Sequence, residues 1–166
     1  ENAETSAGYE VSSVFVGVSG QHIKGENSKG VVAITNRNRT ITQSEVKRVI
    51  EAAQAIVIPV DREIMHVLSK EFTVDDQSGI KDPVGMSAVR LEAEVHIITA
   101  ATASIQNMIK AVAKAGFQHR DIVFNALASA DAVLSKDEKE LGVALIDIGG
   151  GTTDIIVYME GGVAYS

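Results

Sequence analysis

Apolar residues along this chain occur in short blocks. In some blocks they recur with a period of two, as in strands, and in others with a period of about 3.6, as in helices. Residues 10–18 (EVSSVFVGV) are rich in β-branched and aromatic residues and predict a strand buried on both faces. Residues 30–35 (GVVAIT) predict another short strand. Thr42 to Glu45 spells T-x-x-E, a capping box that predicts the start of an amphipathic helix. Its apolar stripe consists of Val46, Val49, Ile50, Ala53 and Val57.

Residues 63–73 and 87–99 have the composition of strands, and the second block alternates strictly. Its apolar positions are Val89, Leu91, Ala93, Val95 and Ile97, and its polar positions are Arg90, Glu92, Glu94 and His96. A period of two predicts an antiparallel sheet with one face in the core. The other face is then either solvated, which is the default for mixed charges, or covered by a partner. The intervening residues 74–86 are rich in Gly, Pro and Asp and predict a loop.

The second half of the chain has different elements. Apolar residues spaced as in a helix, followed by Gly116, predict a helix that ends at this glycine; they are Ile105, Met108, Ile109 and Val112. Residues 122–125 predict a strand, residues 126–134 a short helix, and residues 135–142 a charged linker. A glycine-rich hairpin follows in residues 145–158 (LIDIGGGTTDIIVY).

Composition narrows the functional classes. The chain has 166 residues and a net charge of -7, which disfavours nucleic acid as a partner because a phosphate backbone requires clustered cations. It has no cysteine, so disulfides and Cys-ligated zinc are excluded. No run reaches the ~18 apolar residues that a membrane-spanning helix requires. The chain starts Glu-Asn-Ala without an initiator methionine, and we expect it to be a piece of a longer protein.

The three consecutive glycines 149–151 exceed what a tight hairpin requires, since one or two residues with positive φ suffice. Their presence indicates a ligand close to the backbone, and successive N–H groups in such a turn bind phosphate oxygens. Thr152 and Thr153 add hydroxyl donors, and Asp147 is placed to hold a hydrated Mg²⁺. An alternative is a plain glycine-rich turn capped by Asp147 and Asp154.

Several long stretches resemble the FtsA family of bacterial cell-division actin homologues. They are SVFVGVSGQHI, GVVAI, PVDREIMHVLSKEF, GIKDPVGMSAVRLEAEVHIITA, QNMIKAVAKAGF and LASADAVLSKDEKELGVALIDIGGGTTDIIVY. The resemblance implies an α/β fold, an actin-like ATPase (ribonuclease H-like) partial domain with an inserted small α+β subdomain, 1C. By resemblance, residues 1–19 and 100–142 belong to subdomain 1A, residues 20–99 are 1C, and residues 143–166 are the phosphate-2 β-meander that opens subdomain 2A.

The resemblance implies ATP and Mg as cofactors and assigns no catalytic residue. The residues that match the family's second phosphate loop are Asp147, Gly149, Gly150, Gly151, Thr152 and Thr153, with Asp147 reaching Mg through water. The family's first phosphate loop and adenosine pocket have no counterpart in these residues. We therefore expect weak ATP binding by this chain and tight binding by the longer protein, with at most weak ATPase activity there. The isolated chain is not expected to be an enzyme.

The same resemblance implies a cell-division scaffold. It would polymerise at the membrane, link the ring of the tubulin homologue FtsZ to that membrane, and recruit late divisome proteins through 1C. The expected location is the cytoplasmic face of the inner membrane at the division site, with membrane contact through a segment outside these residues. Two alternatives remain, a type IV pilus assembly platform protein of the same fold and an actin-fold kinase or chaperone ATPase, although no residue is dedicated to a catalytic acid or substrate pocket.

The expected meander could also complete the sheet of subdomain 1A. Its strands, residues 143–148, 154–159 and 163–165, are predicted to lie beside strand 10–18, within one chain or in a strand-exchanged dimer. The linker 135–142 can span ~26 Å at ~3.3 Å per residue, which is enough for either arrangement. The four histidines lie on separate predicted elements, so we expect packing or surface roles for them rather than a metal site; they are His22, His66, His96 and His119.

Overall fold

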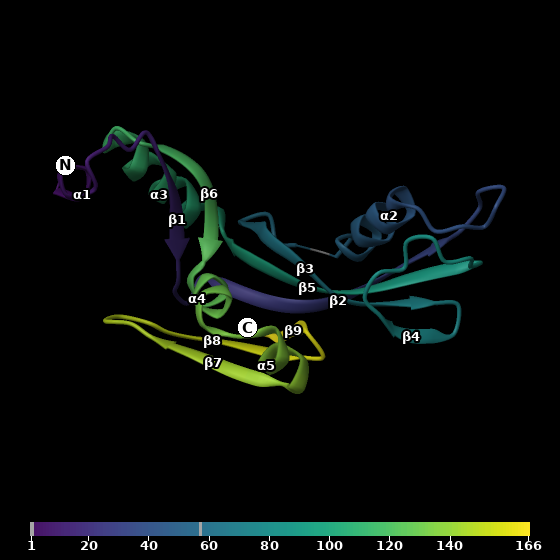
Figure 1. Cartoon of the computed structure of the whole chain (residues 1–166). Helices are drawn as coiled ribbons and strands as arrows, with labels where there is room; N and C mark the ends of the chain where they lie inside the picture. Colours follow the sequence, from purple (N-terminus) through teal and green to yellow (C-terminus); the bar gives the residue numbers. More distant parts are fainter. Residues whose placement is uncertain (1, 57) are drawn as a thin grey trace.

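The computed structural model describes residues 2–56 and 58–166. Within these residues the strands form three separate sheets, with orders β1-β6, β2-β5-β3-β4 and β7-β8-β9 (Figure 1). The helices are α1 (Asn2–Ala7), α2 (Gln43–Ala53), α3 (Thr102–Lys114), α4 (Asn125–Val133) and α5 (Lys136–Leu141). The strands are β1 (Ser13–Val18), β2 (Ile23–Ala33), β3 (Arg62–Val74), β4 (Gln77–Ile80), β5 (Arg90–Ala101), β6 (Gln118–Phe124), β7 (Val143–Ile148), β8 (Thr153–Met159) and β9 (Gly162–Tyr165). None of the described helices is long and apolar enough to cross a membrane.

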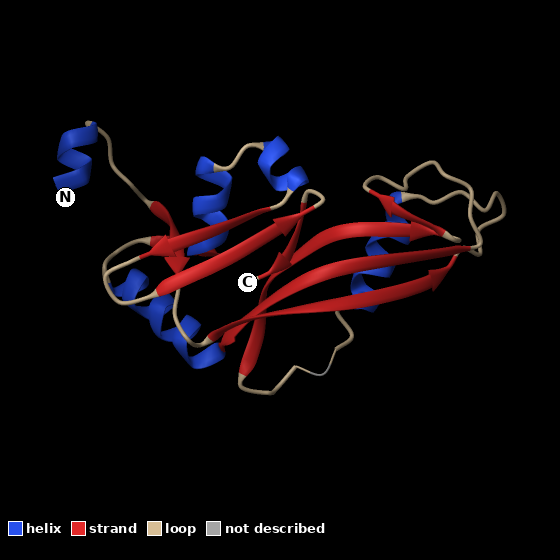
Figure 2. Ribbon diagram, turned by 90° about the horizontal axis from the view of Figure 1, so that it is seen from below, coloured by secondary structure: helices blue, strands red, loops and turns tan. Residues whose placement is uncertain are grey.

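Helix α2 covers one face of the four-stranded sheet β2-β5-β3-β4, as Figure 2 shows from below with α2 behind the long strands. The predicted capping box is confirmed, because the Thr42 side chain caps the helix while Glu45 accepts the Thr42 amide at 3.1 Å. Of the predicted apolar stripe, Val49 and Ala53 are fully buried, whereas Val57 lies outside the described residues. The local signal at residues 42–45 thus fixes where the helix begins.

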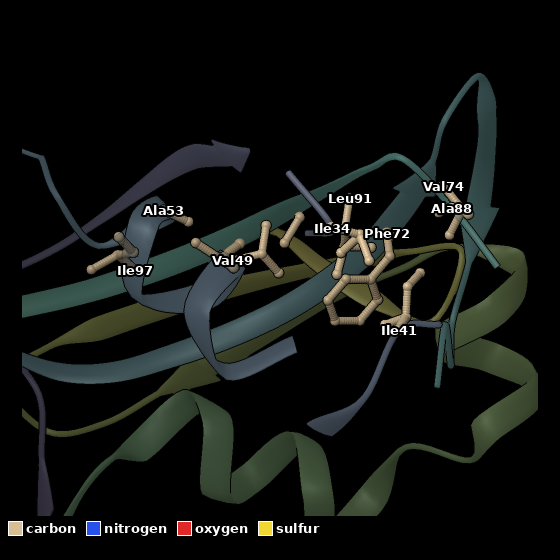
Figure 3. Close-up of a cluster of buried hydrophobic side chains, with 11 residues drawn as sticks. Ile34, Ile41, Val49, Ala53, Phe72, Val74, Ala88, Leu91 and Ile97 are labelled. Atoms are coloured by element: carbon tan, nitrogen blue, oxygen red, sulfur yellow. The ribbon is translucent and has the colours of Figure 1, made fainter. Parts of the chain in front are cut away.

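The core beneath α2 is apolar and closely packed (Figure 3). Val49 of α2 and Leu91 and Ile97 of β5 are completely buried, and burial of each such side chain contributes about 1.5–3 kcal/mol. Gly30 in β2 permits the close approach of the helix. A β-carbon there would lie 2.9 Å from Cα of Ala53, and closer still to the carbonyl oxygen of Val49. The helix backbone therefore rests directly on β2.

The alternation predicted for residues 87–99 is confirmed in β5 for its core face, where Leu91, Ala93, Val95 and Ile97 are buried. Val89 is an exception, since it precedes the strand and is 54% exposed. A solvated opposite face is wrong for the second half of the strand, because His96, Ile98 and Ala100 are also buried. Residues outside the four-stranded sheet cover them, and a sequence period cannot reveal such cover.

The three-stranded meander β7-β8-β9 supplies much of that cover. The His96 ring bonds to Asn27 Oδ1 (2.6 Å) and to Ser166 Oγ (2.8 Å), while Asn27 Nδ2 donates to the Ala164 carbonyl (3.0 Å). Gly162 lies so close to β3 that a β-carbon there would be 2.8 Å from Cα of Lys70. The meander is therefore fastened to the four-stranded sheet along β9.

The predicted pairing of the meander with strand 10–18 within one chain is wrong. Among the described residues β1 pairs with β6 alone, in parallel, and the meander forms its own sheet. The linker 135–142 is also not extended, because Lys136–Leu141 is helix α5 with its own capping box between Ser135 and Glu138. The meander instead packs its apolar face on α4 and on the four-stranded sheet, where Ile156, Tyr158 and Val163 are buried.

Two strands differ in burial or length from the prediction. Strand β1 is not buried on both faces, since Phe15 is 65% exposed and the sheet has only β6 as the neighbour of β1. The prediction for residues 30–35 captured only the end of β2, which begins at Ile23 and pairs with β5 along its whole length. The first half of β2 is polar, so pairing rather than apolar pattern makes it a strand.

The predicted loop 74–86 contains strand β4, which forms a hairpin with β3. The turn is stabilised by Asp75, which has a φ of 53° and whose Oδ1 accepts the amides of Val89 (3.0 Å) and Arg90 (2.9 Å). The other predicted elements are confirmed with shifted ends. Helix α3 ends before Gly116, which has a φ of 89°.

Candidate functional site

The glycine hairpin, Gly149–Thr152, joins β7 to β8 at an exposed tip. It is closed by a hydrogen bond from the Gly149 amide to the Thr152 carbonyl at 2.9 Å. None of the three glycines has a positive φ, so turn geometry does not require them. A β-carbon on Gly150 or Gly151 would meet no atom within 4 Å, and the amides of these two residues donate to no group in the described part of the chain. The tip therefore offers open backbone donors, which suits an anion.

Two carboxylates lie behind this tip on one face of the hairpin. Asp147 in β7 is paired directly with Asp154 in β8. Both residues lie within the strands rather than in the turn itself. Like charges directly opposite each other destabilise a sheet. A cation between them would remove this repulsion.

Helix α4 reaches one of these carboxylates. Ser129 Oγ donates to Asp147 Oδ2 at 2.7 Å, so the orientation of this carboxylate is fixed by a helix that precedes the meander. At the start of α4, the Asn125 side chain lies against Gly17 of β1, where a β-carbon would overlap its Oδ1. Thr152 joins the same region because its hydroxyl lies 3.1 Å from the Ser19 hydroxyl.

The structure brings together some of the predicted site residues and separates others. Asp147, Gly150, Gly151 and Thr152 lie at the tip or directly behind it. The Gly149 amide is already engaged within the hairpin. Thr153 opposes Ile148 and, by strand alternation, points to the face opposite Asp154. Three residues that sequence reasoning did not assign to the site contact it, namely Ser19, Ser129 and Asp154.

A topological signal could have identified Ser19. Ser19 follows β1 and Asn125 follows β6, and these strands are parallel, so their carboxyl ends meet at one edge. Ligands of open α/β sheets bind at this edge. Ser129 has no such signal, because its contact with Asp147 depends on how the meander packs against α4.

The histidines do not form part of this site. His66 and His96 lie in β3 and β5, where burial lowers the pKa of both rings. In the described residues no group of three or more His, Asp or Glu side chains is arranged to hold a metal ion. Any cation at the hairpin would therefore be held by Asp147 and Asp154 together with water and ligand oxygens.

Comparison with known proteins gives a consistent match. The family model "SHS2 domain inserted in FTSA" matches residues 20–99. Three relatives carry the name cell division protein FtsA. They are 51% identical in Borreliella burgdorferi, 46% in Pseudomonas aeruginosa and 40% in Escherichia coli K12. Each alignment includes 100% of this chain and 40%, 39% and 39% of the respective relative.

The chain thus spans about two fifths of the length of the curated relatives it matches. Residues 20–99, hereafter the SHS2 domain, contain the sheet β2-β5-β3-β4 up to Thr99 together with α2. The family model for residues 20–99 and the sequence identity along the whole chain both indicate FtsA. This chain belongs to the FtsA family, an actin-like ATPase family with an inserted SHS2 domain.

Proposed function

We propose that this chain is part of a cell-division protein that binds Mg–ATP at the glycine hairpin. The observation that carries the proposal is the open backbone at Gly150 and Gly151 in front of two paired carboxylates. The name cell division protein FtsA, shared by the three relatives above, supports the biological role.

Each residue of the hairpin has a defined task in this proposal. The amides of Gly150 and Gly151 and the Thr152 hydroxyl donate to phosphate oxygens. Asp147, oriented by Ser129, and Asp154 hold the water ligands of Mg²⁺, whose charge neutralises that of the phosphates. Gly149 closes the hairpin, and Thr153 would reach a phosphate only from the other face.

Affinity measurements test this part of the proposal. A charge-assisted hydrogen bond contributes only about 1.5–3 kcal/mol, and the loss of freedom on association consumes several of them. We therefore expect the isolated chain to bind Mg–ATP with a dissociation constant far above the micromolar range in calorimetry. A Gly150→Val variant should bind more weakly still. Micromolar affinity of the chain would show that this hairpin alone suffices, and equal binding by the variant would contradict a role for the open backbone.

The wider role that we propose is that of a divisome scaffold. In this role the protein self-associates at the cytoplasmic face of the inner membrane, links FtsZ to it, and recruits late division proteins through the SHS2 domain. The four-stranded sheet supports the last point, since its distal end with α2 and β4 projects away from β1, β6 and the meander (Figure 1). The type IV pilus platform and the actin-fold kinase are less well supported, because the matching family model describes the SHS2 domain inserted in FtsA and the three relatives carry the FtsA name.

A chimera tests the cellular role. The matched part of the Escherichia coli relative, 40% identical, would be replaced by this chain and produced in cells depleted of their own copy. We expect division to be restored and a fluorescent fusion to form rings at mid-cell. Filamentous cells with a stable, diffuse chimera would contradict the proposal, and a chimera carrying Gly150→Val is the matched control for the nucleotide site.

A further inference from the structure

A histidine of the SHS2 domain is bonded to the backbone at the start of α4. Nε2 of His66, in β3, accepts the amide of Phe124 at 3.0 Å. Phe124 is the last residue of β6, occupies the N-cap position of α4, and is only 3% exposed. A side chain of the four-stranded sheet thus accepts a hydrogen bond from a buried amide, and such an amide is costly to leave unpaired.

From this point α4 leads directly to the candidate nucleotide site. The helix has no side-chain hydrogen bond at its N-cap, so the His66 contact contributes to fixing where it begins. Ala126 and Ala130 are completely buried, which packs the helix closely against its surroundings. About 7.5 Å further along the axis, at 1.5 Å per residue, Ser129 donates to Asp147. One short helix thus joins His66 to the carboxylate of the site.

The contact requires the neutral form of His66. A protonated ring would direct an N–H at the Phe124 amide, and unlike a hydroxyl this donor cannot rotate to become an acceptor. Burial lowers the pKa of His66, and the charge of Asp121 in β6 partly opposes this effect. Of the strands near β3, β5 carries His96, which lies opposite Leu68, two residues after His66 in β3. Strands β4 and β9 carry no charged side chain.

We propose that His66 is a positioning residue for the candidate nucleotide site, connecting the SHS2 domain to Asp147 through α4 while its ring is neutral. The inference rests on the proposed nucleotide site and adds its regulation. Because coupling between two sites is reciprocal, a partner that displaces β3 would weaken nucleotide binding, and bound nucleotide would oppose that displacement.

The test uses nuclear magnetic resonance on the 166-residue chain, which reports weak binding. Mg–ATP is titrated into wild type, His66→Ala and His66→Gln, and the amides of Gly150 and Gly151 are followed. Loss of one hydrogen bond predicts about three- to tenfold weaker binding for His66→Ala. Glutamine retains an uncharged acceptor, so His66→Gln should bind within about twofold of wild type. His119→Ala, which removes an exposed histidine of β6, should leave the affinity unchanged.

A pH profile separates positioning from a general loss of stability. As the pH falls below 6.5, wild-type affinity should fall with the same midpoint as the shift of the Phe124 amide, whereas His66→Gln should show no such midpoint. In a double-mutant cycle, Ser129→Ala should weaken binding as His66→Ala does, with no further loss in the double variant. Additive losses, or a wild-type pH profile in His66→Gln, would overturn the inference; should His66→Ala not fold, the glutamine profile decides.

The inference and the proposed function fail separately. If wild type shows no Mg–ATP shifts at the glycine hairpin, the nucleotide proposal is wrong. The connection is then tested without nucleotide by a pH titration of the amide resonances. It predicts that the Ser129 and Asp147 amides shift with the same midpoint as the Phe124 amide, as His66 becomes protonated. Amides at Ser129 and Asp147 that do not respond would refute the connection itself.

Discussion

Replacing Gly30 by alanine should destabilise the SHS2 domain, because α2 rests on the β2 backbone at this point. The added β-carbon would lie 2.9 Å from Cα of Ala53 and closer still to the carbonyl oxygen of Val49 and the amide nitrogen of Ala53. All three are backbone atoms of one helix, so no side-chain rotation can relieve the overlap. The helix has to withdraw from the sheet.

The size of the effect follows from packing. Carbon atoms attract best at about 3.5–4.0 Å, so the helix must move by more than about 0.5 Å. A gap of this size forfeits roughly a quarter to a half of the contact energy of the atoms involved, and overpacking typically costs about 1–3 kcal/mol. Alanine also restricts the unfolded chain, which returns about 0.4–1 kcal/mol only where it fits without strain. We expect a net loss of about 2–3 kcal/mol.

Urea unfolding followed by circular dichroism measures this loss as a lower midpoint at an unchanged slope. Gly150→Ala is the matched control. A β-carbon at Gly150 meets no atom within 4 Å and its φ is not positive, so its free energy of unfolding should stay within about 0.5 kcal/mol of wild type or rise slightly. If the two variants were equally stable, the direct contact of α2 with β2 would be refuted.

Three further predictions follow from the SHS2 domain. Thr42→Ala removes the N-cap of α2 and should lower the free energy of unfolding by about 1 kcal/mol in the same assay, whereas Ser44→Ala leaves the capping side chains in place and should change it little. The folded state disfavours protonation of His66 and His96, whose pKa values lie below the unperturbed 6.5. Stability should therefore be complete above pH 6.5 and fall as pH drops toward the folded-state values, and constant stability between pH 7 and 5 would contradict this. Arg90 Nη2 lies 3.2 Å from Glu92 Oε1 in an ion pair on the surface of β5. The variants Arg90→Glu and Glu92→Arg each reverse one of these charges, and we expect each to alter self-assembly or partner binding of the longer protein. Normal assembly and binding by both variants would show that this face is merely solvated.

Local signals in the sequence were sufficient for much of the secondary structure. The capping box at Thr42 and Glu45 and the alternation around Leu91 each depend on contacts between residues a few positions apart. The same local rule would have predicted α5, since Ser135 and Glu138 form the identical S/T-x-x-E pattern. The glycine hairpin was likewise recognisable, because its residues are adjacent in the chain.

The chain's own residues, by contrast, could not indicate which faces would cover one another. His96 belongs to a strictly alternating strand, and only the packing of β9 against it determines that this face is buried. Whether the meander joined β1 or formed its own sheet was equally undetermined, because the hydrogen bonds of a strand edge are satisfied by either neighbour.

The candidate site shows the same difference between what local sequence signals indicate and what tertiary packing decides. Sequence alone indicated a glycine-rich hairpin with a carboxylate, Asp147, near the end of its first strand, since both are local properties. The register of the hairpin places Asp154 opposite Asp147. Tertiary structure decided that Ser129 orients Asp147 and that His66 bonds to the start of the helix that carries Ser129. These two contacts join residues 18 and 58 positions apart in the chain, so they exist only once the buried faces of separate elements have been packed together.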